Sequence, residues 1–209
     1  MPTVEQVRVL YTGTDAGHDF DHVLRVRSLA KRLAELEGAD LKIVGAAALL
    51  HDAPQDGQRT VRNTHHLDSA DLARKVLETE GWNRVDIHAV QHCIRSHRFR
   101  SDERPATIEA MCVFDADKLD ALGAIGVARA ISYAALADEP YYVEPSESFL
   151  KSGEKEPGEP HSAYHEFVFK LRKLANCLYT ASARELAERR HKVMTAFFER
   201  LRAEMSVKL

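Results

Sequence analysis

The chain has 209 residues, enough for one large domain or for one domain with a helical extension, since a domain typically has roughly 100–200 residues. Hydrophobic residues make up 44% and charged residues 29% of the sequence, a composition that excludes a disordered or collagen-like chain. The formal net charge of -3 gives no general attraction to nucleic acid. The three scattered cysteines and the absence of a long apolar run favour a cytoplasmic protein without a membrane partner.

The first predicted elements are two helices followed by a polar loop. Apolar residues recur at helical spacing from Phe20 to about Leu36, and Gly38 follows as a C-cap. The next helix starts at the N-cap Asp40 and is apolar nearly all round up to His51 and Asp52, as in a helix at the centre of a bundle. Residues 55–66 are polar and predict a loop long enough to be functional. We interpret the two histidines at its end, residues 65 and 66, as a solvated pair, with a second metal site as the alternative.

Further helices are predicted over residues 69–80, 83–97 and 105–136, the last softly interrupted by Gly123 and Gly126. Residues 140–162 are rich in Pro, Glu, Ser and Gly, which predicts a mobile segment. Residues 163–209 predict an extension of two amphipathic helices packed on the core. Their apolar stripes are Phe167, Leu171, Leu174 and Leu178, then Val193, Phe197 and Leu201. We therefore expect an all-α fold and a single domain over residues 1–209.

Four residues carry the chemistry of the sequence: His22, the adjacent His51 and Asp52, and Asp117. A charged pair that ends an apolar helix is costly to bury unless each group has a partner, and a divalent cation satisfies both. Adjacent helical residues project about 100° apart, so His51 and Asp52 can approach one ion from two directions. Two imidazoles and two carboxylates suit Mn, Fe, Co, Ni or Zn.

At these residues the sequence resembles the HD-domain superfamily of metal-dependent phosphohydrolases, whose signature is a His, a His-Asp doublet and a distant Asp. The segments GHDFDHVLRV (17–26), AALLHD (47–52) and DADKLDALGAIGVAR (115–129) are similar to those of small bacterial HD hydrolases. The resemblance covers nearly the whole chain. It implies an HD-type helical bundle, and some members of this branch are nucleoside triphosphate pyrophosphohydrolases.

The resemblance also implies roles for individual residues. His22, His51, Asp52 and Asp117 become the ligands of a divalent ion, with Mn favoured over Co, Ni, Fe, Zn or Mg. Asp52 and Asp56 are the expected catalytic residues, Asp56 because it resembles an acidic residue that follows the doublet in related enzymes and could orient a metal-activated water.

Phosphate charge requires cationic groups, and the candidates for substrate binding are Lys118, His97, Arg98 and Lys170. The expected substrate is a nucleotide or another small phosphorylated metabolite, with a nucleoside triphosphate favoured. Three alternatives stay open: a 5'-nucleotidase, a phosphodiesterase, or a non-catalytic signalling module with the HD fold. A homodimer is also left open.

Overall fold

The computed structural model describes residues 2–11, 20–53, 64–99 and 103–206. The described residues form helices and connecting segments without a strand, so the all-α prediction is confirmed. Their contacts divide the chain into two compact units. Unit 1 comprises Met1–Lys118 with Leu178–Ala183, and unit 2 comprises Leu119–Cys177 with Arg184–Leu209. The single domain expected from the sequence stays a prediction.

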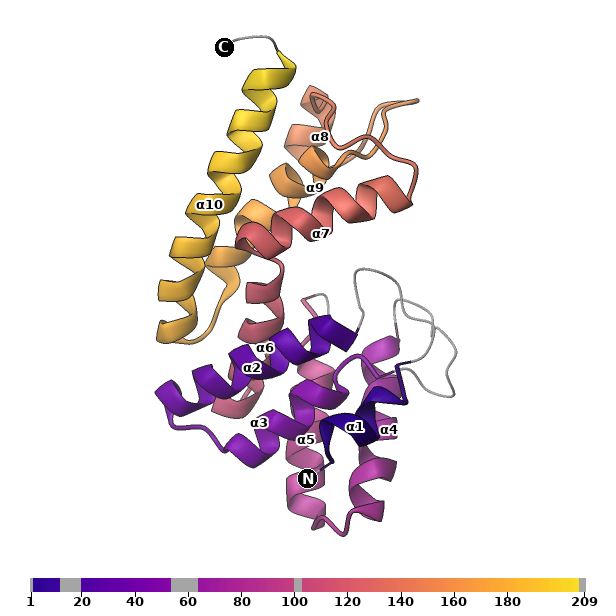
Figure 1. Cartoon of the computed structure of the whole chain (residues 1–209), viewed down its shortest axis with the longest axis vertical. Helices are drawn as coiled ribbons and strands as arrows, with labels where there is room; N and C mark the ends of the chain where they lie inside the picture. The colour runs from indigo at the N-terminus through magenta and orange to yellow at the C-terminus, as the bar shows by residue number, and fades with distance from the viewer. Residues whose placement is uncertain (1, 12–19, 54–63, 100–102, 207–209) are drawn as a thin grey trace. The chain divides into compact units, whose positions relative to one another are not determined.

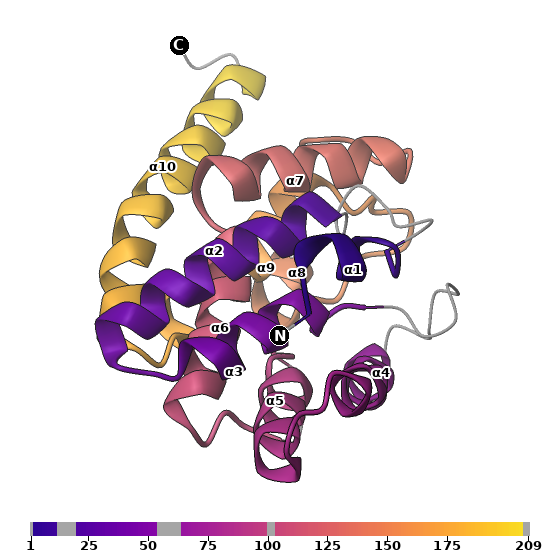
Figure 2. The ribbon, with the colours of Figure 1, turned by 60° about the horizontal axis from the view of Figure 1, so that its bottom comes forward.

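Unit 1 is built around a buried central helix. Its helices are α1 (Val4–Arg8), α2 (Phe20–Glu37), α3 (Leu41–Leu50), α4 (His65–Thr79), α5 (Arg84–Ser96) and most of α6 (Ile108–Asp120). Helix α3 contacts both α2 and α5, and α4 packs on α5 (Figures 1 and 2). Residues 43–50 of α3 are all buried, as its nearly uniform apolar sequence predicts.

Local signals in the sequence explain where α2 and α3 meet. Gly38 adopts a left-handed φ of 71°, and the Ala39 N–H donates to the Ala34 carbonyl at 2.9 Å, which ends α2 as a glycine cap does. The Asp40 carboxylate then accepts hydrogen bonds from the Lys42 and Ile43 N–H groups. The predicted N-cap of the central helix is therefore confirmed.

A buried carboxylate ties the short segment at residues 178–183 to α6. Asp115, which is 0% exposed, accepts hydrogen bonds from the Tyr179 N–H at 2.9 Å and from the Thr180 N–H and hydroxyl at 2.8 and 2.7 Å. These bonds satisfy the donors of the segment that precedes α10, and they also satisfy the buried charge.

Unit 2 contains α7 (Gly123–Leu136), α8 (Glu147–Ser152), α9 (Ala163–Phe169), the 3-10 helix η2 (Leu171–Cys177) and most of α10 (Ala181–Met205). The Phe167 and Phe198 rings stack at 4.5 Å between α9 and α10. On α7, Gly126 lets Ala121 and Met194 approach its backbone closely, because a Cβ at this position would lie 2.2 Å from the Ala121 carbonyl oxygen and 2.6 Å from Met194 Cε.

The structure corrects the predicted helix over residues 105–136. It is divided into α6 and α7, because Leu122 is extended and Gly123 has a left-handed φ of 72°, a conformation that interrupts an α-helix. The predicted loop over residues 55–66 is also too long at its C-terminal end, since α4 already begins at His65.

Two details of the predicted tail differ from the structure. The first tail helix breaks at Lys170 into α9 and η2. In α10 the large buried side chains are Met194 and Phe198, whereas Val193 and Phe197 are 53% and 41% exposed. The predicted stripe is therefore shifted by one residue, because α10 carries apolar side chains on two adjacent faces and periodicity alone does not choose between them.

The segment predicted to be mobile, residues 140–162, contains α8. Ser146 caps this helix, and Glu159 accepts hydrogen bonds from both the Ser146 N–H and its hydroxyl at 2.8 Å. His165 lies 3.0 Å from the same carboxylate. These hydrogen bonds, together with the burial of Phe149, explain how a segment poor in apolar residues contains a helix; its mobility stays a prediction.

Candidate metal centre

The C-terminus of α3 presents the His-Asp doublet. His51 is the C-cap residue of α3 and is 0% exposed, and the Asp52 side chain that follows is 10% exposed. Residues 43–50 of α3, which precede them, are all buried. The rigid apolar helix thus places two polar side chains at one buried end.

His51 and His97 occupy equivalent positions on two different helices. Each is a C-cap residue, of α3 and α5 respectively. The His51 Nδ1 lies 2.9 Å from the Ala48 carbonyl, and the His97 Nδ1 lies 2.6 Å from the Ile94 carbonyl. Because a carbonyl oxygen only accepts, both Nδ1 atoms carry the proton, and the Nε2 lone pairs are left for another partner.

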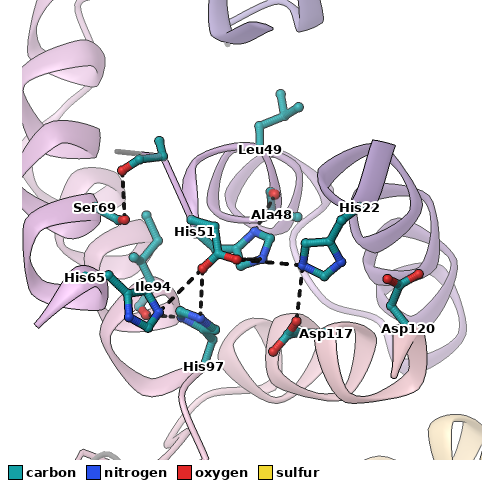
Figure 3. Close-up of polar contacts among 12 residues, drawn as sticks. His22, Ala48, Leu49, His51, His65, Ser69, Ile94, His97, Asp117 and Asp120 are labelled. Carbon is teal, nitrogen blue, oxygen red and sulfur yellow. Dashed lines mark hydrogen bonds and ion pairs between the residues drawn. The ribbon is translucent and has the colours of Figure 1, made fainter. Parts of the chain in front are cut away.

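Both Nε2 atoms lie close to the Asp52 carboxylate, and Figure 3 shows the two rings with the dashed lines that mark their polar contacts. His51 Nε2 lies 3.5 Å from Asp52 Oδ2, and His97 Nε2 lies 3.5 Å from Asp52 Oδ1. The His51 Nε2 is buried and has no hydrogen-bond partner among the described residues. A buried lone pair in this setting is the expected state of a metal ligand, whose other ring nitrogen is held by a carbonyl.

His22 and Asp117 complete the first group of polar side chains, group A (His22, His51, Asp52, Asp117). His22, in the first turn of α2 and 1% exposed, has its Nε2 3.7 Å from Asp52 Oδ2 and 3.5 Å from Asp117 Oδ1. The nitrogen and oxygen atoms of His22, His51 and Asp52 all lie within 4.8 Å of one another. Ligands about 2.1 Å from a common ion lie roughly 3.0–4.2 Å apart, depending on the angle between them, so the separations of 3.5 and 3.7 Å fit a divalent cation. The structure therefore brings together the four residues singled out in the sequence.

A second group, group B (Asp52, His65, His97), shares the same carboxylate. His65 Nε2, from the first residue of α4, lies 3.6 Å from Asp52 Oδ1. The ligand atoms of the three residues lie within 4.8 Å of one another. Interpreting residues 65 and 66 as a solvated pair was therefore wrong: both belong to α4, His66 is 7% exposed and His65 faces Asp52. The sequence holds no spacing signal that relates His65 to the doublet, because His65 lies 13 residues after Asp52 and on a different helix.

The electrostatics of the centre favour a neutral His51 ring and a charged Asp117 carboxylate. Burial lowers the pKa of His51 to about 4, and the neighbouring Asp52 only partly offsets this effect. Burial raises the pKa of Asp117, but Lys118 and His22 outweigh it and hold that pKa well below its usual range. Neutral imidazole and ionised carboxylate are the forms that bind divalent metals.

The four predicted substrate-binding residues have different surroundings. The Lys118 Nζ lies 2.5 Å from Asp117 Oδ2 and 2.9 Å from the His97 carbonyl, so this cation lies next to both groups. His97 belongs to group B, and Arg98 follows it half-buried. Lys170 is exposed in unit 2 and forms an ion pair with Glu166 at 2.7 Å. The four substrate-binding roles stay predictions.

Asp56 and Asp120 differ in what the structure describes of them. Asp56, the predicted catalytic acid/base, lies outside the described residues. Asp120 is 1% exposed and accepts a hydrogen bond from the Arg129 guanidinium at 2.6 Å. This ion pair satisfies the buried charge of Asp120.

No single helix within the described ranges combines the length and apolarity of a membrane span; α6 and α7 pass that test together, by length and composition.

Comparisons with known proteins agree with this geometry. A family model described as HD domain matches residues 19–122. The uncharacterised Bacillus subtilis protein YpgQ is 34% identical over 96% of this chain and 93% of its own length. Its crystal structure in complex with ADP covers 97% of both chains with a TM-score of 0.73.

Two other relatives are an HD-superfamily hydrolase and a nuclease. The crystal structure of the hydrolase, from Bacillus thuringiensis, is 28% identical and covers 97% of this chain and 94% of that one with a TM-score of 0.72. Ribonuclease Y of Chloroflexus aurantiacus is 31% identical over 54% of this chain, which spans 20% of that enzyme. The chain belongs to the HD domain family of metal-dependent phosphohydrolases.

Proposed function

We propose that this phosphohydrolase acts on nucleotides, with a nucleoside triphosphate as substrate and pyrophosphate as a product. The observation that carries the proposal is the Asp52 carboxylate, whose two oxygens lie 3.5–3.7 Å from the Nε2 atoms of four histidines. A centre of this kind handles polyanionic phosphates. The similarity to YpgQ, whose crystal structure contains ADP, supports a nucleotide as the ligand.

Group A and group B would each hold one divalent ion, and Asp52 would serve both. Divalent cations bound there supply Lewis acidity, neutralise phosphate oxygens and lower the pKa of water. The mixed nitrogen and oxygen donors suit Mn, Fe, Co, Ni or Zn, and we favour Mn.

The side chains of the chain itself have three tasks in this proposal. The carbonyls of Ala48 and Ile94 hold the Nδ1 protons of His51 and His97, so that each ring keeps one orientation and one tautomer. Lys118 holds Asp117 Oδ2, which leaves Oδ1 directed at His22. Asp56, two residues after Pro54 in the sequence, is the proposed acceptor of the proton of the attacking water.

Lys118 and Arg98, both predicted to bind phosphate, receive different roles in this proposal. Lys118 already contacts two acceptors of the protein, so we assign it mainly to Asp117. Arg98, next to His97 in the sequence, is the better candidate for a phosphate contact, because a guanidinium can bind two phosphate oxygens at once. A homodimer and a cytoplasmic location stay predictions from the sequence.

The test is a panel of nucleoside mono-, di- and triphosphates incubated with the protein and MnCl2, followed by mass analysis of the products. Pyrophosphate and a nucleoside monophosphate from a triphosphate would support the proposal. Release of single phosphate from monophosphates would identify a 5'-nucleotidase instead. No hydrolysis of any nucleotide, although the wild-type protein binds Mn, would reject the proposed substrate class and favour a non-catalytic module.

The panel includes a short RNA and a cyclic nucleotide, because the similarity to Ribonuclease Y favours a phosphodiesterase as the second candidate. Cleavage of these phosphodiesters with intact triphosphates would replace the first proposal. The His51→Ala variant is the matched control, since activity that survives the loss of this buried ring would come from a contaminating enzyme.

A further inference from the structure

The C-terminus of α3 is capped by groups that directly follow it and by one group from near the N-terminus of the chain. The last carbonyls of a helix have no partner within it and must find one elsewhere. Here each has its own donor: the His51 ring for Ala48 (2.9 Å), the Tyr11 hydroxyl for Leu49 (2.9 Å) and the Ala53 N–H for Leu50 (3.2 Å). The end of α3 that bears the doublet is thus held by hydrogen bonds from donors outside the helix.

Tyr11 is the distant member of this set. It lies 38 residues before Leu49 in the chain, is 6% exposed, and packs its ring on Phe20, the first residue of α2, at 5.3 Å. Burial raises the pKa of Tyr11, the Asp52 charge raises it further, and a hydrogen bond with the Asp52 backbone lowers it. The hydroxyl therefore stays protonated. It donates its hydrogen bond to the Leu49 carbonyl and lies near Asp52.

We propose that Tyr11 is a positioning residue of the metal centre: its buried hydroxyl fixes the backbone from Leu49 to Asp52 and so sets the direction of the carboxylate that groups A and B share. The inference rests on the proposed metal role of Asp52. The Tyr11 hydroxyl bonds to a backbone carbonyl, so its effect passes through the peptides of the α3 terminus. An N-terminal segment outside the residues matched by the HD family model would thereby belong to the working site.

The test compares two variants that each lose one buried hydrogen bond to a backbone carbonyl. Tyr11→Phe removes the bond to Leu49, and the control Gln91→Met removes the bond from Gln91 to the Ala70 carbonyl, at 3.2 Å between α5 and α4. Mn²⁺ affinity is measured by titration calorimetry on metal-free protein, and amide hydrogen exchange is measured for residues 50–53. Thermal unfolding reports the general loss of stability.

We expect Tyr11→Phe to bind Mn²⁺ about 10-fold more weakly than the wild type, since partners behind metal ligands typically contribute 10- to 100-fold in affinity. Exchange at residues 50–53 should accelerate in this variant alone. Gln91→Met should show a similar thermal shift with unchanged Mn²⁺ affinity.

Three results would overturn the inference. If Tyr11→Phe keeps wild-type affinity and wild-type exchange, or if Gln91→Met loses as much affinity, then Tyr11 contributes only to packing. If the wild-type protein itself binds no Mn²⁺, the proposed metal centre fails and the inference fails with it, so that the two failures are distinguished by the wild-type titration.

Discussion

Replacing Asp52 with Asn tests whether one carboxylate serves two ion sites. The substitution keeps the shape of the side chain and removes its charge. Because Oδ2 faces His22 and His51 while Oδ1 faces His65 and His97, the change affects group A and group B together. We therefore expect Asp52→Asn to lose all metal binding, rather than one ion of two.

The magnitude follows from ligand linkage. A ligand present at 100 times its Kd stabilises the folded state by about 2.7 kcal/mol. For a chain of this length, each kcal/mol shifts the melting temperature by roughly 2–4 °C, so one bound ion should raise the Tm of the wild type by about 5–11 °C. Asp52→Asn should show almost no rise on addition of Mn²⁺.

The assay is thermal unfolding followed by circular dichroism, with and without Mn²⁺. Asp86→Asn is the matched control: it removes a carboxylate from the first turn of α5, where Asp86 pairs with Lys42 at 2.6 Å, and it should keep the full metal-induced shift. Helical content before heating should be the same in all three proteins. A metal-induced rise in Asp52→Asn as large as that of the wild type would refute the assignment of Asp52 as the shared ligand.

Three further predictions concern single residues. His65→Ala, a change at a side chain 30% exposed, should reduce the metal content measured by mass spectrometry from two ions to one per chain, and retention of two would remove His65 from group B. Asp56→Ala should keep its metal and lose about 10²- to 10⁴-fold in turnover; an unchanged rate would exclude it as the acid/base group. Asp115→Asn replaces the carboxylate that accepts from the Tyr179 and Thr180 N–H groups with an uncharged amide. It should lower the free energy of unfolding, measured in urea, by about 2–4 kcal/mol. Equal stability of this variant and the wild type would contradict the role of Asp115.

The helical fold of unit 1 follows largely from local sequence signals. The Asp40 cap, the left-handed Gly38 and the apolar run of α3 act within one or two turns of the chain, so they can be recognised without tertiary information. The same holds for the doublet at the end of α3, since a buried helix that ends in His and Asp needs a partner for both groups wherever it packs.

The relations between distant helices could not be obtained in this way. His65 lies 13 residues after Asp52 in the sequence, and Tyr11 lies about 40 residues before the doublet. No helical periodicity therefore relates His65 or Tyr11 to Asp52. Likewise, the choice of Met194 and Phe198 over Val193 and Phe197 as buried residues of α10 depends on which face meets α9. Sequence period places side chains around one helix axis, whereas the angle and rotation at which two helices pack decide which of those side chains meet. The sequence by itself thus determined most helices of unit 1 and the residues of group A. Only the tertiary structure decided that one carboxylate stands between four imidazoles.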